Sequence, residues 1–166
     1  MKATTIQQID IWRAGRSEHQ RLEFKEAKAQ FDNRKLQRYC VALANEGGGH
    51  LLLGVQDEPP RKVVGTSAFN DPAEMAAKLF HALGFRVEIE EVMHPDGRVL
   101  VFHVPGRPRG TVYDFEGAYL MRAGQELVPM SEDRLRAIFA EGQPEWLLQP
   151  ALKDCDADQV VQLLDT

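Results

Sequence analysis

The feature that most constrains the fold is the stretch from Leu36 to Gly65, LQRYCVALANEGGGHLLLGVQDEPPRKVVG. Its first part spaces apolar residues three and four apart, which predicts a helix with one buried face. The glycines at 47–49 supply the positive φ angles with which helices commonly end. The apolar run His50–Val55 then predicts a strand buried on both faces. Asp57 follows it, at the strand end where open α/β sheets tend to place functional groups.

The rest of the chain alternates helical and strand patterns. Helices are expected over residues 4–15, 71–83 and 131–140, and strands over 22–25, 86–93, 98–104, 111–114, 117–122 and 125–129. In the first strand Leu22 and Phe24 alternate with Glu23 and Lys25, which predicts one face in water. We therefore expect an α/β fold, a mixed sheet flanked by helices, in residues 1–142.

Residues 143–166 are predicted to form a linker and a C-terminal helix that begins near Asp156. The apolar stripe of this helix has no obvious partner in the sequence. Three roles stay open for it: packing on the domain, pairing with a second copy as a homodimer, or beginning a further region.

Charge is unevenly distributed along the chain. The net charge is −5, but residues 1–65 hold eleven Lys and Arg against eight Asp and Glu, a surplus of +3. A mildly basic half is compatible with nucleic-acid binding, which depends on phosphate contacts. Charge that merely keeps the surface soluble is the alternative. No apolar run approaches the ~20 residues of a membrane span, and Cys40 and Cys155 form no CxxC pair, so a cytoplasmic protein without membrane contact is expected.

Three acids and a lysine are candidates for chemistry. Glu18 and Glu23 come together at the start of one predicted strand, and Asp57 leaves the end of the buried strand. If the two strands pair, the three carboxylates converge on a site for Mg²⁺ or Mn²⁺, whose preferred ligands are oxygens. Such an ion activates water and stabilises charge on a phosphoryl group. The alternative is a set of surface acids with a weak Glu23–Lys25 pair.

Basic residues are candidates for contacts with a phosphate backbone. They fall in separate groups along the chain: Arg34, Lys35, Arg38; Arg61, Lys62; Arg107, Arg109; and Arg122. If they line one groove, they form a backbone-binding surface. The glycines at 47–49 are not predicted to bind a nucleotide, because a phosphate loop follows a strand and opens a helix, whereas these close a helix and open a strand. No ATP is expected.

A family resemblance rests on motifs in a fixed order. SEHQRLEFKEA, CVALANEGGGHLLLGVQD, VVG, VLVFHVP and GAYLMRAG together resemble the Schlafen AlbA_2 domain family over roughly residues 5–140. The resemblance implies an α/β domain that binds nucleic acid, and this chain holds a single lobe where Schlafen cores fold as two linked lobes. In some Schlafen members three carboxylates hold a divalent metal and cleave tRNA or rRNA. The corresponding residues here are Glu18, Glu23 and Asp57, with Lys25 matching the lysine of the E-F-K motif.

Three functional hypotheses follow. The first is a nucleic-acid-binding domain, RNA-directed and with metal-dependent endoribonuclease activity, in which Glu18, Glu23 and Asp57 hold the metal and Lys25 steadies the phosphate. The second is a non-catalytic DNA-binding module of a transcriptional regulator. The third is a protein-interaction domain that uses the C-terminal helix.

Overall fold

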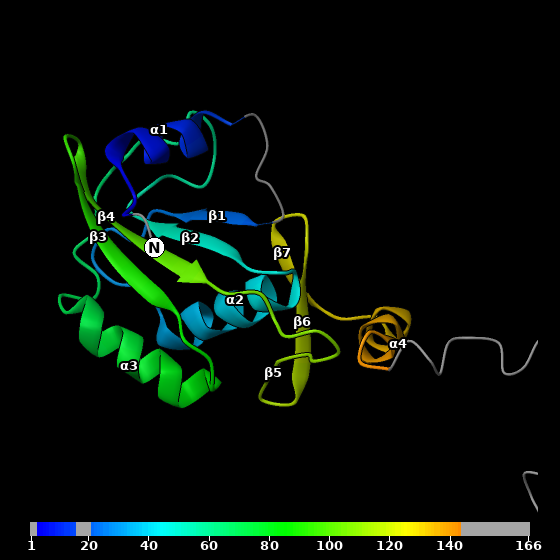
Figure 1. Cartoon of the computed structure of the whole chain (residues 1–166). Helices are drawn as coiled ribbons and strands as arrows, with labels where there is room; N and C mark the ends of the chain where they lie inside the picture. The colour runs from blue at the N-terminus through cyan, green and yellow to red at the C-terminus, as the bar shows by residue number, and fades with distance from the viewer. Residues whose placement is uncertain (1–2, 16–20, 144–166) are drawn as a thin grey trace, which may run out of the picture.

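The computed structural model describes residues 3–15 and 21–143 and shows a mixed α/β fold (Figure 1). Its elements, in chain order, are α1 (Ile6–Ala14), β1 (Leu22–Lys25), α2 (Asn33–Asn45), β2 (Gly49–Leu53), α3 (Pro72–Leu83), β3 (Glu88–His94), β4 (Gly97–Val104), β5 (Asp114–Phe115), β6 (Ala118–Ala123), β7 (Glu126–Pro129) and α4 (Glu132–Ala140). The predicted C-terminal helix from Asp156 lies outside the described residues.

The first four strands form one mixed sheet in the order β1-β2-β4-β3. Strands β1 and β2 are parallel, with Leu22 opposite His50 and Lys25 opposite Leu53. Strand β4 is antiparallel to both β2 and β3. Because parallel neighbours need a crossover connection, α2 packs on one face of the sheet between them.

Helices cover both faces of this sheet (Figure 1). On one face α1 inserts Ile9, which packs with Phe24 and Leu52. On the opposite face α2 and α3 enclose a larger core that includes Leu43, Leu51 and other apolar side chains. Successive residues of β2 thus point into different cores, which explains why its sequence is apolar throughout.

Local hydrogen bonds close both ends of α2, and the C-terminal end forms as the sequence predicts. The Asp32 side chain accepts a hydrogen bond of 2.7 Å from the Lys35 backbone N–H and caps the helix. At the other end Gly47 and Gly48 adopt φ angles of +95° and +89°. The Gly48 N–H donates to the Leu43 carbonyl at 2.8 Å. The glycine run therefore satisfies the last carbonyls of the helix, and α2 passes directly into β2.

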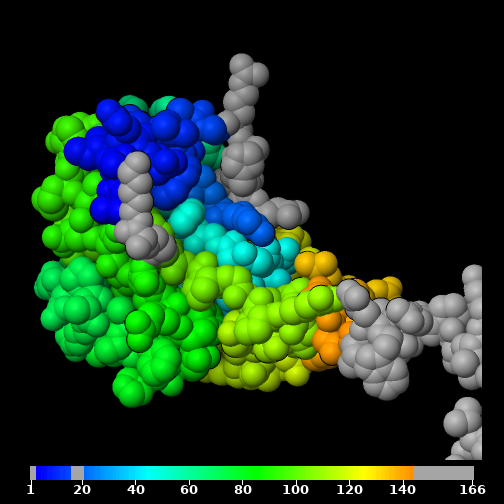
Figure 2. Space-filling model, viewed as in Figure 1, coloured from blue at the N-terminus to red at the C-terminus, as the bar shows by residue number. Residues whose placement is uncertain are grey.

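A second sheet of β5, β6 and β7 packs against α2. Asn45, buried at the end of α2, donates to the carbonyls of Tyr113 and Leu120, at 2.9 Å each, and accepts from the Tyr113 N–H. In the space-filling view the second sheet and α4 form one side of the molecule (Figure 2). The amide of Asn45 thus fixes the second sheet to the first through α2.

Two further features complete the fold. After β2 an isolated antiparallel bridge joins Val55 to Val63. Among residues 3–15 and 21–143, the helices are all too short or too polar to cross a membrane.

Candidate nucleic-acid interface

The side chain of Glu23 is fully buried, and the prediction that it faces water is wrong. Arg122 of β6 reaches this side of β1, so Glu23 and Phe24 point into two different buried environments. One carboxylate oxygen, Oε2, lies 2.5 Å from an Arg122 guanidinium nitrogen, and the other, Oε1, lies 2.8 Å from Lys25 Nζ. Neither oxygen has a well-aligned hydrogen bond from a described residue, so charge holds the carboxylate in place.

Lys25 connects Glu23 to Asp57. Its ammonium lies 2.5 Å from Asp57 Oδ2 and 5.4 Å from the centre of the Tyr39 ring on α2. Burial lowers the pKa of Lys25, but the hydrogen bond to Asp57 and the close contact with the charged Glu23 outweigh that effect, so its pKa is raised above the usual value and the ammonium keeps its charge. The parallel pairing of β1 and β2 brings Glu23, Lys25 and Asp57 together.

The third predicted carboxylate, Glu18, lies outside the described residues. Within the described ranges, no three His, Cys, Asp or Glu side chains are placed to hold a metal ion. The space between Glu23 and Asp57, where a shared metal ion would lie, holds the Lys25 ammonium instead. The described residues therefore form a network of ion pairs and do not fit a divalent metal.

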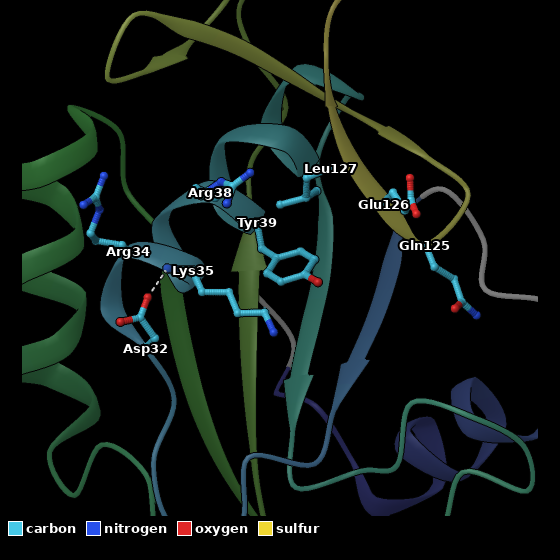
Figure 3. A pocket seen from close by; sticks show the side chains of 8 residues that line it. All are labelled: Asp32, Arg34, Lys35, Arg38, Tyr39, Gln125, Glu126 and Leu127. Carbon is cyan, nitrogen blue, oxygen red and sulfur yellow. Dashed lines mark hydrogen bonds between the residues drawn. The ribbon is translucent and has the colours of Figure 1, made fainter.

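An open groove lies between the first turns of α2 and the turn that joins β6 to β7 (Figure 3). Its volume is about 720 Å³. We call it the α2–hairpin groove, and its lining residues are Asp32, Arg34, Lys35, Arg38, Tyr39, Gln125, Glu126 and Leu127. Figure 3 shows Lys35 and the Tyr39 ring extending into the same space, with Gln125 and Glu126 on the opposite side. Tyr39 also contacts Lys25, so the groove adjoins the ion-pair network.

Comparison with known proteins agrees with this architecture. The sequence matches the model of the family described as Schlafen, AlbA_2 over residues 18–131. The chain belongs to the Schlafen AlbA_2 family. A search of curated proteins finds no significant match.

Solved structures also resemble this AlbA_2 domain. The DIP2311 protein of Corynebacterium diphtheriae is 17% identical with a TM-score of 0.63, over 94% of this chain and 36% of that one. This chain thus spans about a third of the length of that protein. The N-terminal domain of a RecG-related protein from Nitrosomonas europaea is 19% identical with a TM-score of 0.49, over 78% of this chain and 96% of that one. At 17% identity, the likeness to the DIP2311 protein supports the fold alone.

The predicted phosphate-binding residues of the AlbA_2 domain do not all lie on one surface. Arg34, Lys35 and Arg38 are exposed and line the α2–hairpin groove. Lys62 and Arg109 are exposed as well, but they do not line this groove. The sequence predicted that all the basic groups line one groove, but only the group on α2 does so.

Three of the predicted arginines instead have structural partners. Arg61 is 4% exposed, and its guanidinium donates to the Gly15 carbonyl at 2.7 Å. Arg122 is 6% exposed beside Glu23. The guanidinium of Arg107 makes two contacts with Glu141, at 2.8 and 2.9 Å, and joins the β4–β5 connection to the end of α4. The prediction that Arg61 and Arg122 line a surface groove is wrong, because the fold buries both.

A histidine cluster in the AlbA_2 domain was not predicted as a unit. His50 and His103 are directly opposite in β2 and β4, and their Nδ1 atoms lie 3.0 Å apart. His103 Nε2 lies 2.8 Å from Glu90 Oε2, and Trp12 of α1 stacks on the His50 ring at 4.6 Å. Burial, together with the neighbouring His103, lowers the pKa of His50. Sequence spacing carries no sign of this cluster, which depends on the register of three antiparallel strands and the docking of α1.

Proposed function

We propose that this AlbA_2 domain binds the phosphate backbone of RNA in the α2–hairpin groove. The observation that carries the proposal is the group of three exposed cations on one face of α2, beside an open groove. Within the described part of the chain Lys35 and Arg38 form no ion pair, so both are available to a ligand. Arg34 pairs with Glu116, which is also exposed, and such a pair is weak enough for a phosphate to replace.

Family membership supports a nucleic-acid-related function, and the choice of RNA follows the Schlafen resemblance. The three exposed cations of the groove suit contacts to phosphate oxygens, which position a strand without selecting its sequence. Duplex DNA is the ligand of the alternative hypothesis, a non-catalytic regulator module. Binding measured in parallel on RNA and on duplex DNA distinguishes the two.

The test is the salt dependence of binding. The triple substitution Arg34→Gln, Lys35→Gln and Arg38→Gln removes three phosphate contacts. For a single strand each contact contributes about 0.7 to the slope of log K against log salt concentration, so the slope should fall by about 2. Fluorescence anisotropy with labelled RNA measures this slope.

A matched control removes the same charge elsewhere. Lys78, Arg86 and Arg136 lie outside the groove lining, and their triple substitution by Gln changes the net charge equally. Binding of RNA by the control variant should keep the wild-type slope. An equal fall of the salt slope in both triple variants would show that net charge, and not the groove, attracts the nucleic acid.

Metal-dependent endoribonuclease activity at Glu18, Glu23 and Asp57 remains a prediction from the sequence, with Mg²⁺ or Mn²⁺ as its cofactor. The position of Lys25 between Glu23 and Asp57 argues against it, so we derive no cleavage step. Incubating the protein with tRNA and Mn²⁺ tests the prediction, and cleavage that disappears in Glu23→Gln would support it. Homodimer formation, through which two lobes would grip one RNA, is a further proposal that sedimentation equilibrium with and without RNA checks.

A further inference from the structure

The ammonium of Lys25 occupies a position that two acids define. Asp57 follows β2 at its carboxyl end, and Lys25 ends the neighbouring parallel strand, opposite Leu53. The ammonium lies 2.8 Å from an oxygen of Glu23 and 2.5 Å from an oxygen of Asp57. A Mg²⁺ ion bound by both oxygens would need to lie about 2.0–2.1 Å from each. Since that is the space the ammonium fills, the lysine and a bridging metal ion exclude one another.

The lysine is held in this position. Its side chain is only 15% exposed, and the Tyr39 ring lies beside its ammonium. Displacement of the ammonium would leave Glu23, which is fully buried, without one of the two cations that the described residues place beside it. A buried charge that loses a partner is strongly unfavourable.

The charges of the four described groups of the network are also equal in number. Glu23 and Asp57 supply two negative charges, and Lys25 and Arg122 supply two positive charges within 2.8 Å of them. A divalent cation that approached this network would meet no excess of negative charge among these four groups. Carboxylate sites for Mg²⁺, by contrast, depend on uncompensated oxygens.

We propose that Lys25 is the resident cation of the Glu23–Asp57 site and takes the place of a divalent metal. The site is built as a cation-binding site, and removal of the ammonium converts it into one for Mn²⁺. The inference concerns the ion-pair network alone and holds whether or not the α2–hairpin groove binds RNA.

The experiment titrates the full chain with Mn²⁺ and follows free Mn²⁺ by electron paramagnetic resonance after dialysis against EDTA. Wild-type protein and Lys25→Arg should bind Mn²⁺ no more tightly than Asp57→Asn does. Lys25→Met removes the charge with a side chain of similar length and should bind one Mn²⁺ at least tenfold more tightly than wild type. The double variant Lys25→Met with Asp57→Asn should lose that gain.

Two results would overturn the inference. Stoichiometric Mn²⁺ binding by the wild type that Asp57→Asn abolishes would show that the metal displaces the lysine. A folded Lys25→Met protein without a gain in Mn²⁺ binding would show that the two acids do not form a cation site. If Lys25→Met fails to fold, Mn²⁺ binding by the wild type still tests whether the lysine excludes the metal. RNA binding measured separately in EDTA distinguishes failure of this inference from failure of the groove.

Discussion

Substitution of Arg122 by Met tests whether Glu23 depends on its ion pair. The guanidinium lies 2.5 Å from Glu23 and also donates to the Leu22 carbonyl at 3.2 Å. Removing one partner of a buried ion pair is destabilising by about 3–5 kcal/mol. Lys25 still contacts the other oxygen of Glu23, so we expect the lower end, about 3 kcal/mol in the free energy of unfolding.

Urea unfolding followed by circular dichroism measures this loss. With a slope of about 2 kcal/mol per molar urea, the midpoint of Arg122→Met should fall by about 1.5 M. The exposed Arg136 on α4 provides the control, since Arg136→Met should change the free energy of unfolding by less than about 0.5 kcal/mol.

A double-mutant cycle isolates the pair itself. Glu23→Met leaves Arg122 buried without this carboxylate and should also be destabilising by about 3 kcal/mol. The double variant replaces both charges by apolar side chains and leaves neither charge unpaired, so its loss should be no more than about 3 kcal/mol and not the sum of about 6. Additive losses would refute the reasoning, because they would show that the two residues stabilise the fold independently.

Two further predictions concern the glycine run and the end of α4. A Cβ on Gly49 would lie 2.3 Å from the backbone oxygen of Arg21, so Gly49→Ala should lower the free energy of unfolding, measured in urea, by about 1–3 kcal/mol. Gly142→Ala is the control, because a Cβ there would have its nearest contact at 3.4 Å. Its free energy of unfolding should stay within about 0.5 kcal/mol of wild type. The hydrogen bond from Arg107 lowers the pKa of Glu141 from 4.5 to about 2, so the ion pair contributes stability above pH 4.5 that is lost as pH falls toward 2. An NMR titration of the Glu141 carboxyl checks this, and a midpoint that does not rise in Arg107→Gln would contradict the assignment.

Local sequence determined most of the secondary structure of this protein. The cap at Asp32, the glycines after Asn45 and the proline that follows Asp71 each act on backbone groups within four residues of themselves. Such signals can be read without tertiary information, because the groups that they satisfy are close in sequence. The apolar run of β2 indicated in the same way that helices would cover both faces of the sheet.

Tertiary structure decided which charged residues remain available. The alternation in β1 predicted a wet face for Glu23, and only the packing of the second sheet shows that this face is covered. The same packing buries Arg122, while Arg34 and Arg38 remain exposed on α2. All three are arginines, so residue type gives no reason for this difference in burial. Burial of a long polar side chain depends on partners about a hundred residues away in the chain, such as Arg122 for Glu23. A local pattern therefore predicts the strand, but it cannot predict what lies over it.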